Sequence, residues 1–219
     1  MLNTIITLDQ LIQALYETVV MVGISLLIGG LIGIVIGITL VVTRPGGLIP
    51  NTFIYHLMNP IVNIFRSLPF IILLVAIIPF TRMIVNTSIG TSAAIVPLTI
   101  FIAPYIGRLV ENSLLEVNPG IMEAADSMGA TPFQVIWYFM LPEAFGSLIL
   151  TMTTATIGLI GATAMAGTVG GGGIGDLAIS YGYQRFDTFT IIVTVAILVI
   201  VVQAIQSIGN VLARKARRD

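Results

Sequence analysis

Long apolar runs alternate with short polar segments along the chain, and five of these runs are long enough to span a membrane. A helix needs about 20 mostly apolar residues to cross the hydrocarbon core of a bilayer. Each run is apolar all round, and lipid leaves backbone polar groups to be satisfied within the segment, so the runs are predicted to be helices. The predicted spans are Thr18 to Val42, Phe53 to Pro79, Thr91 to Val110, Phe145 to Ala166 and Thr188 to Leu212.

Composition agrees with a membrane location and excludes several kinds of chemistry. Of the 219 residues, 57% are hydrophobic and 9% are charged, whereas soluble domains carry about 25% charged residues. The chain has no cysteine, which excludes disulfides, thiolate metal sites and cysteine nucleophiles. Its single lysine, Lys215, lies near the C-terminus, so the fold has no P-loop lysine. We expect an all-α membrane protein with one transmembrane domain, residues 1–219, that does not hydrolyse ATP itself.

The distribution of basic residues predicts the orientation of the chain. The first 43 residues contain no Lys or Arg, and basic residues favour the cytoplasmic side. Arg44, Arg108 and the basic C-terminal segment then lie inside, whereas Arg82 and Arg185 fall on the other side. An odd number of spans places the termini on opposite faces, so the N-terminus is predicted outside and the C-terminus in the cytoplasm.

The longest predicted cytoplasmic segment, about residues 111–143, contains the signals of two short helices. Asn118 is a good N-cap and Pro119 suits the first helical position, so one helix is expected from Pro119 to Met128, ended by Gly129. A second helix is expected to begin at Thr131 and Pro132, with Gln134 completing a capping box, and to stop at Leu141 and Pro142. The first helix has Glu123 and Asp126 on its polar face, whereas helices that lie on lipid favour basic residues. It is therefore interpreted as a docking element for a protein partner.

The same segment resembles the EAA signature of ABC importer permeases, E-A-A-x3-G-x9-I-x-L-P. Glu123, Ala124, Ala125, Gly129, Leu141 and Pro142 match it at the right spacing, with Phe139 in the isoleucine position. The resemblance to the methionine importer permeases extends over most of the chain, through TRPG, IVNIFRSLPFIILL, IPFTR, TSIG, AAIVPLT and MGATP, which begin at residues 43, 61, 78, 87, 93 and 128.

This resemblance implies a type I ABC importer permease with five spans, located in the bacterial cytoplasmic membrane. It implies a homodimer that docks on two cytoplasmic ATPases through the EAA residues. Those ATPases bind ATP and Mg²⁺, so no cofactor or metal is expected in this chain. An extracytoplasmic methionine-binding protein, commonly a lipoprotein, would deliver L-methionine and D-methionine. A permease for another small amino acid or for a methionine derivative is the alternative.

The end of the fourth span contains a candidate gate. Met165 lies among small residues and precedes the glycine run 167–175. From the residues alone, ordinary helix packing and pore closure are equally good interpretations of Met165. The family resemblance favours the gate, because related permeases close their pore from this part of the span.

Several other features have structural interpretations or fail as functional motifs. Gly29, Gly33 and Gly37 form small-xxx-small pairs, interpreted as a helix-packing surface. Arg66, the one charge predicted inside an apolar span, is expected near the cytoplasmic end, where it snorkels to the interface, and His56 is interpreted as interfacial. Gly170 to Gly175 match a dinucleotide motif, but no strand precedes them.

Two other classes of function fit the sequence less well. An intramembrane enzyme needs converging ionisable residues, and the predicted spans contain almost none. A passive channel would explain the glycines but not an acidic docking helix.

Overall fold

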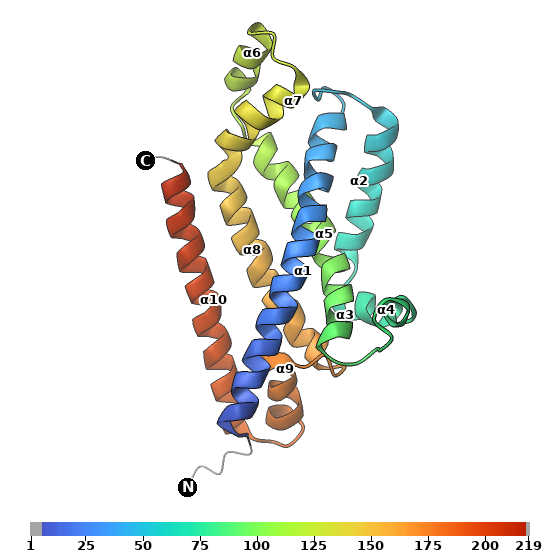
Figure 1. Cartoon of the computed structure of the whole chain (residues 1–219), viewed down its shortest axis with the longest axis vertical. Helices are drawn as coiled ribbons and strands as arrows, with labels where there is room; N and C mark the ends of the chain where they lie inside the picture. The colour runs from blue at the N-terminus through green and yellow to red at the C-terminus, as the bar shows by residue number, and fades with distance from the viewer. Residues whose placement is uncertain (1–5, 218–219) are drawn as a thin grey trace.

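The computed structural model describes residues 6–217, which form a bundle of long helices with a small helical cap at one end (Figure 1). The first turn of α1 and the last turn of α10 lie at opposite ends of this bundle (Figure 1). The elements are α1 (Leu8–Thr43), α2 (Thr52–Ser67), α3 (Phe70–Ala76), α4 (Ile78–Val85), α5 (Thr91–Leu115), α6 (Pro119–Ser127), α7 (Pro132–Gln134), η1 (Val135–Met140), α8 (Leu141–Gly167), α9 (Gly173–Leu177), η2 (Ala178–Tyr183) and α10 (Thr188–Ala216).

The spans predicted first, third, fourth and fifth are confirmed as long apolar helices. Within residues 6–217, the segments long and apolar enough to cross a membrane are α1, α5, α10 and the continuous segment Pro132–Gly167. The helices extend beyond the predicted spans, since α1 begins at Leu8 rather than at Thr18. Their number rises to five if the bent pair α2 and α3 counts as one span.

The second predicted span is wrong as a straight helix. It is broken into α2 and α3, whose axes meet at 103°. The break lies at Leu68 and Pro69, both in extended conformation. A proline disfavours helical backbone at the preceding residue, so Pro69 turns the chain here instead of continuing the helix. Pro79, predicted to end the span, belongs to the first turn of α4.

The glycines of α1 pack against α5, which confirms their interpretation as a packing surface. A Cβ built on Gly33 would lie 2.7 Å from the Ala103 carbonyl oxygen and 2.7 Å from the Ile106 side chain. A Cβ on Gly37 would lie 2.6 Å from the carbonyl oxygen of Gly107. Small residues on both helices therefore bring the two backbones into close contact.

Helix α5 lies at the centre of the fold. It packs against α1, α2, α3, α4 and α8, and Leu98, Ile102, Ile106 and Val110 are completely buried along it. By contrast, the outward faces of α1, α2 and α10 expose large apolar side chains. This inverted surface is the one expected for helices that face lipid or other spans.

The polar connection between the third and fourth spans is shorter than predicted. Helix α5 continues to Leu115, and the chain is helical again from Pro132 without interruption to Gly167. The prediction that a helix stops at Leu141 and Pro142 is therefore wrong. The turn before them, Val135–Met140, is a π-helix, and its wider turn accommodates a proline that lacks an N–H and would crowd the preceding turn of an α-helix.

Candidate functional site

Helix α6 and its two ends form the cap of the bundle, and their geometry follows the sequence signals. The Asn118 side chain accepts a hydrogen bond from the Gly120 N–H at 2.8 Å. The helix ends one residue before the predicted Met128. Gly129 then takes φ of +70°. Its N–H donates to the backbone carbonyl of Asp126, and the N–H of Ala130 donates to the backbone carbonyl of Ala125. This pair of bonds is a Schellman motif, which requires the left-handed residue that glycine supplies.

The predicted docking residues of α6 separate into a buried and an exposed set. Ala125 is completely buried, whereas Glu123, Ala124 and Asp126 are exposed. The two acidic residues line a cavity of about 540 Å³ that also contains Arg44, at the end of α1. Helix α6 lies at one end of the bundle (Figure 1) and packs against it through Ala125, while its acidic residues stay exposed beside this cavity.

Thr131 and Gln134 form the capping box predicted for the second helix of the cap. The Thr131 N–H donates to Gln134 Oε1 at 2.8 Å, and the Gln134 N–H donates to Thr131 Oγ1 at 3.4 Å. This box fixes the start of the segment that enters the bundle.

Leu141 and Pro142 lie apart from the acidic face of α6. They line a separate apolar cavity of about 710 Å³ between α8 and α10. The structure therefore places the six EAA residues at one end of the molecule but does not bring all of them onto a single surface.

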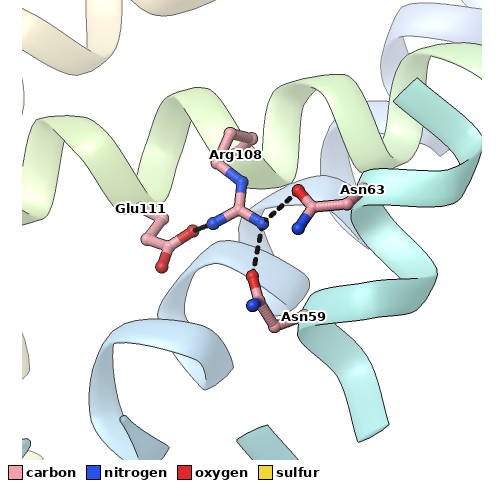
Figure 2. Close-up of polar contacts among 4 residues, drawn as sticks. All are labelled: Asn59, Asn63, Arg108 and Glu111. Carbon is pink, nitrogen blue, oxygen red and sulfur yellow. Dashed lines mark hydrogen bonds and ion pairs between the residues drawn. The ribbon is translucent and has the colours of Figure 1, made fainter. Parts of the chain in front are cut away.

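A largely buried ion pair, together with two side-chain amides, joins α5 to α2 (Figure 2). Arg108 forms an ion pair with Glu111, one turn later on α5. Its other terminal nitrogen donates to the Asn59 side chain at 2.6 Å and to the Asn63 side chain at 2.8 Å. The side chains of Arg108 and Glu111 are only 15% and 5% exposed. Sequence reasoning missed this network, although Asn59 and Asn63 are spaced to share one face of α2.

Met165 lies on a free face of α8. Its side chain is 50% exposed, whereas its neighbours Ala162 and Ala166 are buried. Gly158 and Gly161 lie on the same face, and a Cβ built on either would have no atom within 4 Å. Met165 is therefore outside the packed core of this chain.

The glycine run after α8 folds into a tight turn that α1 holds in place. Glu17 accepts a hydrogen bond from the Gly173 N–H at 2.8 Å, and Thr18 accepts one from the Ile174 N–H at 3.0 Å. Gly172 and Gly173 both have positive φ. A Cβ on Gly173 would lie 2.7 Å from the Thr18 hydroxyl, so a side chain has no room there.

Arg66 is not where the sequence placed it. Helix α2 begins beside the end of α1, where the Asn51 N–H donates to the Thr43 carbonyl. Arg66 lies at the opposite end of α2, and that end is roughly half-way down the bundle (Figure 1). Its side chain is exposed. The break at Pro69 therefore places Arg66 part-way along the bundle rather than beside the end of α1, and its snorkelling to the interface stays a prediction.

The chain matches the family described as the inner membrane component of binding-protein-dependent transport systems, over residues 29–218. The chain belongs to this family. Membership confirms the resemblance seen in the sequence and makes the chain a multi-pass component of the inner membrane.

Named relatives match nearly the whole chain. The probable D-methionine transport system permease protein MetI of Vibrio cholerae is 49% identical over 207 residues, which cover 94% of this chain and 92% of the relative. The D-methionine transport system permease protein MetI of Escherichia coli K12 is 52% identical over 157 residues, which are 72% of each chain.

Solved structures share the fold. A chain of the inward-facing MetNI methionine ABC transporter is 46% identical, with a TM-score of 0.93 over 95% of this chain and 97% of the other. A chain of an amino acid ABC transporter crystallised with histidines is 19% identical with a TM-score of 0.78, and this likeness concerns the fold alone. The type I permease fold implied by the EAA signature is thereby confirmed.

Proposed function

We propose that this chain is the membrane-spanning permease of an ABC importer for methionine, in both the L and D forms. The observation that supports this most directly is the 49% identity to a D-methionine permease over 94% of the chain. The working assembly is two copies of this chain, two cytoplasmic ATPases that bind the nucleotide and Mg²⁺, and an extracytoplasmic methionine-binding protein. In this assembly α2 and α3 together form one broken span, so each copy crosses the membrane five times.

The experiment is reconstitution of the chain with its ATPase and binding protein in proteoliposomes. We expect uptake of labelled L-methionine and D-methionine that requires ATP. Uptake without ATP would indicate a channel. Uptake of a different amino acid in preference to methionine would contradict the substrate but not the importer.

The proposed orientation places the start of α1 outside the cell and the end of α10 in the cytoplasm. The chain has no native cysteine, so single cysteines report their own side of the membrane. Leu8 is 71% exposed, and Leu8→Cys should react with an impermeant thiol reagent added to whole cells. Arg214→Cys should react only in inverted vesicles, and the opposite pattern would contradict the orientation.

The acidic face of α6 is proposed to dock on the ATPase. Glu123 and Asp126 are exposed at the tip of the molecule, where their charges suit a basic groove. Glu123→Lys is expected to reduce ATPase binding and uptake severalfold while the permease still inserts. Asp9→Lys makes the same change of charge in the first turn of α1 and is the control. It should leave both ATPase binding and uptake unchanged. Equal ATPase pull-down by the two variants would remove α6 as the docking element.

Gly129 is proposed to set the angle of α6 toward the ATPase. Gly129→Val forces a β-branched residue into φ of +70°, which costs about 1 kcal/mol or more and disturbs the end of α6. Gly90 is a matched control, because it has φ of +94° and open space but lies at the start of α5. Uptake per ATP hydrolysed should fall for Gly129→Val and stay normal for Gly90→Val. Equal effects would mean that the strain acts on stability alone.

Met165 is proposed to close the inward-facing pore between two copies of α8. A flexible thioether can seal a pore lined by small residues and still move aside. Met165→Ala should leak methionine without ATP or raise futile ATP hydrolysis. Met152→Ala is the control, since Met152 packs against the core from the same helix. If neither variant leaks methionine or raises futile ATP hydrolysis, the gate lies elsewhere.

A further inference from the structure

Helix α2 is polar along one face, although it lies in the membrane region. Thr52, His56, Asn59, Asn63 and Arg66 follow one another at alternating steps of four and three residues, so they lie on one face of the helix. The opposite face exposes large apolar side chains, namely Phe53, Leu57, Ile61 and Ile64. A polar face inside a membrane protein must meet either protein groups or water, because lipid cannot hydrogen-bond to it.

The upper half of this polar face is held by α5, which fixes how α2 is rotated. Arg108 binds both Asn59 and Asn63 (Figure 2), and Glu111 neutralises Arg108. The apolar residue Val62 is buried, which gives α2 a second anchor. Because the rotation of α2 is fixed at Asn63, the position of Arg66 one turn later is fixed as well.

Arg66 lies in the middle of the predicted second span, Phe53 to Pro79, rather than at either end of it. It is the fifteenth of the 16 residues of α2, which places it about 21 Å along the axis from Thr52 at 1.5 Å per residue. The hydrocarbon core of a bilayer is about 30 Å thick. The side chain of Arg66 is exposed; within residues 6–217 it forms no hydrogen bond or close ion pair, and its charge attracts the Glu111 carboxylate from a distance. An ionisable side chain within a membrane span almost always faces the bundle interior or a water-filled cavity rather than lipid.

We infer that Arg66 is the point in the translocation path that binds the α-carboxylate of the amino acid, with the polar face of α2 leading from it to the cytoplasm. This inference rests on the proposed import function. A guanidinium matches a carboxylate in charge and in bidentate geometry, and each amino acid substrate carries that group whatever its side chain. Arg66 thus recognises the backbone part of the solute.

The first test asks whether the site is wet. Arg66→Cys and Ile64→Cys place a thiol at similar depth on opposite faces of α2, in a chain without native cysteine. In the assembled, nucleotide-free transporter, an impermeant charged thiol reagent should label Arg66→Cys from the cytoplasmic side. Ile64→Cys, on the apolar face, should stay unlabelled. Labelling of Ile64→Cys but not Arg66→Cys would overturn the inference.

The second test asks whether the site binds a carboxylate. Ser67→Cys, next to Arg66 and exposed, should be protected from labelling by millimolar methionine and not by methioninol, which has a hydroxymethyl group in place of the carboxylate. Adding Arg66→Gln should abolish the protection by methionine. Equal protection by both compounds, or protection that survives Arg66→Gln, would show that the carboxylate is bound elsewhere.

Transport by the complete complex gives the third test. A charged hydrogen bond of about 1.5 kcal/mol corresponds to about tenfold in rate, so Arg66→Gln should lower methionine uptake about tenfold. Arg66→Lys, which keeps the positive charge, should restore most of it. Loss of the permease dimer in Arg66→Gln would instead assign Arg66 to the interface between copies. Absence of methionine uptake by the unmodified complex would refute the proposed function, whereas uptake unaffected by Arg66→Gln refutes only the role of Arg66.

Discussion

Gly33→Leu is expected to destabilise the helix bundle strongly. The Cβ alone would lie 2.7 Å from the Ala103 carbonyl oxygen, and a backbone atom in the middle of α5 cannot move aside without displacing the helix. Overpacking of a core typically costs about 1 to 3 kcal/mol and occasionally more. We expect the upper end of this range or beyond, seen as a large fall in the thermal unfolding temperature of the detergent-solubilised chain and in the yield of monodisperse protein.

Gly23→Leu is the control for this prediction. Gly23 lies on the same helix, and a Cβ built there has no atom within 4 Å. The substitution should leave stability unchanged or raise it slightly, since leucine favours a helix over glycine. Similar losses for Gly23→Leu and Gly33→Leu would mean that glycine is needed in α1 for some reason other than its contact with α5.

Among substitutions that remove one charge, Arg108→Met is expected to lower the stability of the fold most. It leaves the Glu111 carboxylate buried without its partner and takes the donor away from Asn59 and Asn63 (Figure 2). Removal of one member of a buried ion pair typically costs about 3 to 5 kcal/mol. Denaturant unfolding in detergent should show a loss of this order.

The double variant Arg108→Met with Glu111→Gln separates charge burial from lost contacts. Neutralising Glu111 should recover part of the stability, because the uncompensated charge is then gone. Arg82→Met, at an exposed position on α4, should change stability by no more than about 0.5 kcal/mol. If the double variant is no more stable than Arg108→Met, the hydrogen bonds to α2 rather than the charge of Glu111 account for the loss.

Features set by neighbouring residues could be predicted from the sequence. Asn118 with Pro119, Gly129, and Thr131 with Gln134 are local signals, and each of these ends of helices forms where it was expected. The presence of the long apolar helices also follows from composition, although α1, α5, α8 and α10 are each longer than the predicted spans. In these places no distant contact competes with the local preference.

The effect of each proline could not be predicted from its presence. Pro60 lies inside α2, and Pro97 and Pro104 lie inside α5, whereas Pro69 breaks the chain between α2 and α3. A helix tolerates an internal proline when neighbouring groups or a wider turn satisfy the freed carbonyl. Whether this happens depends on packing, which the neighbouring residues in the sequence do not specify. For that reason neither the bend after α2 nor the continuation of the helix through Pro142 could be predicted.

The Arg108 network was hidden for a similar reason. Arg108 and Asn59 are 49 residues apart in the sequence, and either could face lipid, water or protein by its local context alone. Only the packing of α2 on α5 brings Arg108 and Asn59 together. The same packing sets the position of Arg66 along the bundle.

The bonds from α1 to the glycine turn also bear on how the chain is made. Glu17 and Thr18 are synthesised early, but their partners Gly173 and Ile174 follow 156 residues later. During biosynthesis α1 can pair with α5 once residue 110 has been inserted, while its first turns must await the fourth span and the turn beyond it. Under the proposed orientation, the Glu17 carboxylate stays in the aqueous phase outside the membrane for most of translation. Its hydrogen bond with the Gly173 N–H therefore forms among the last steps of assembly.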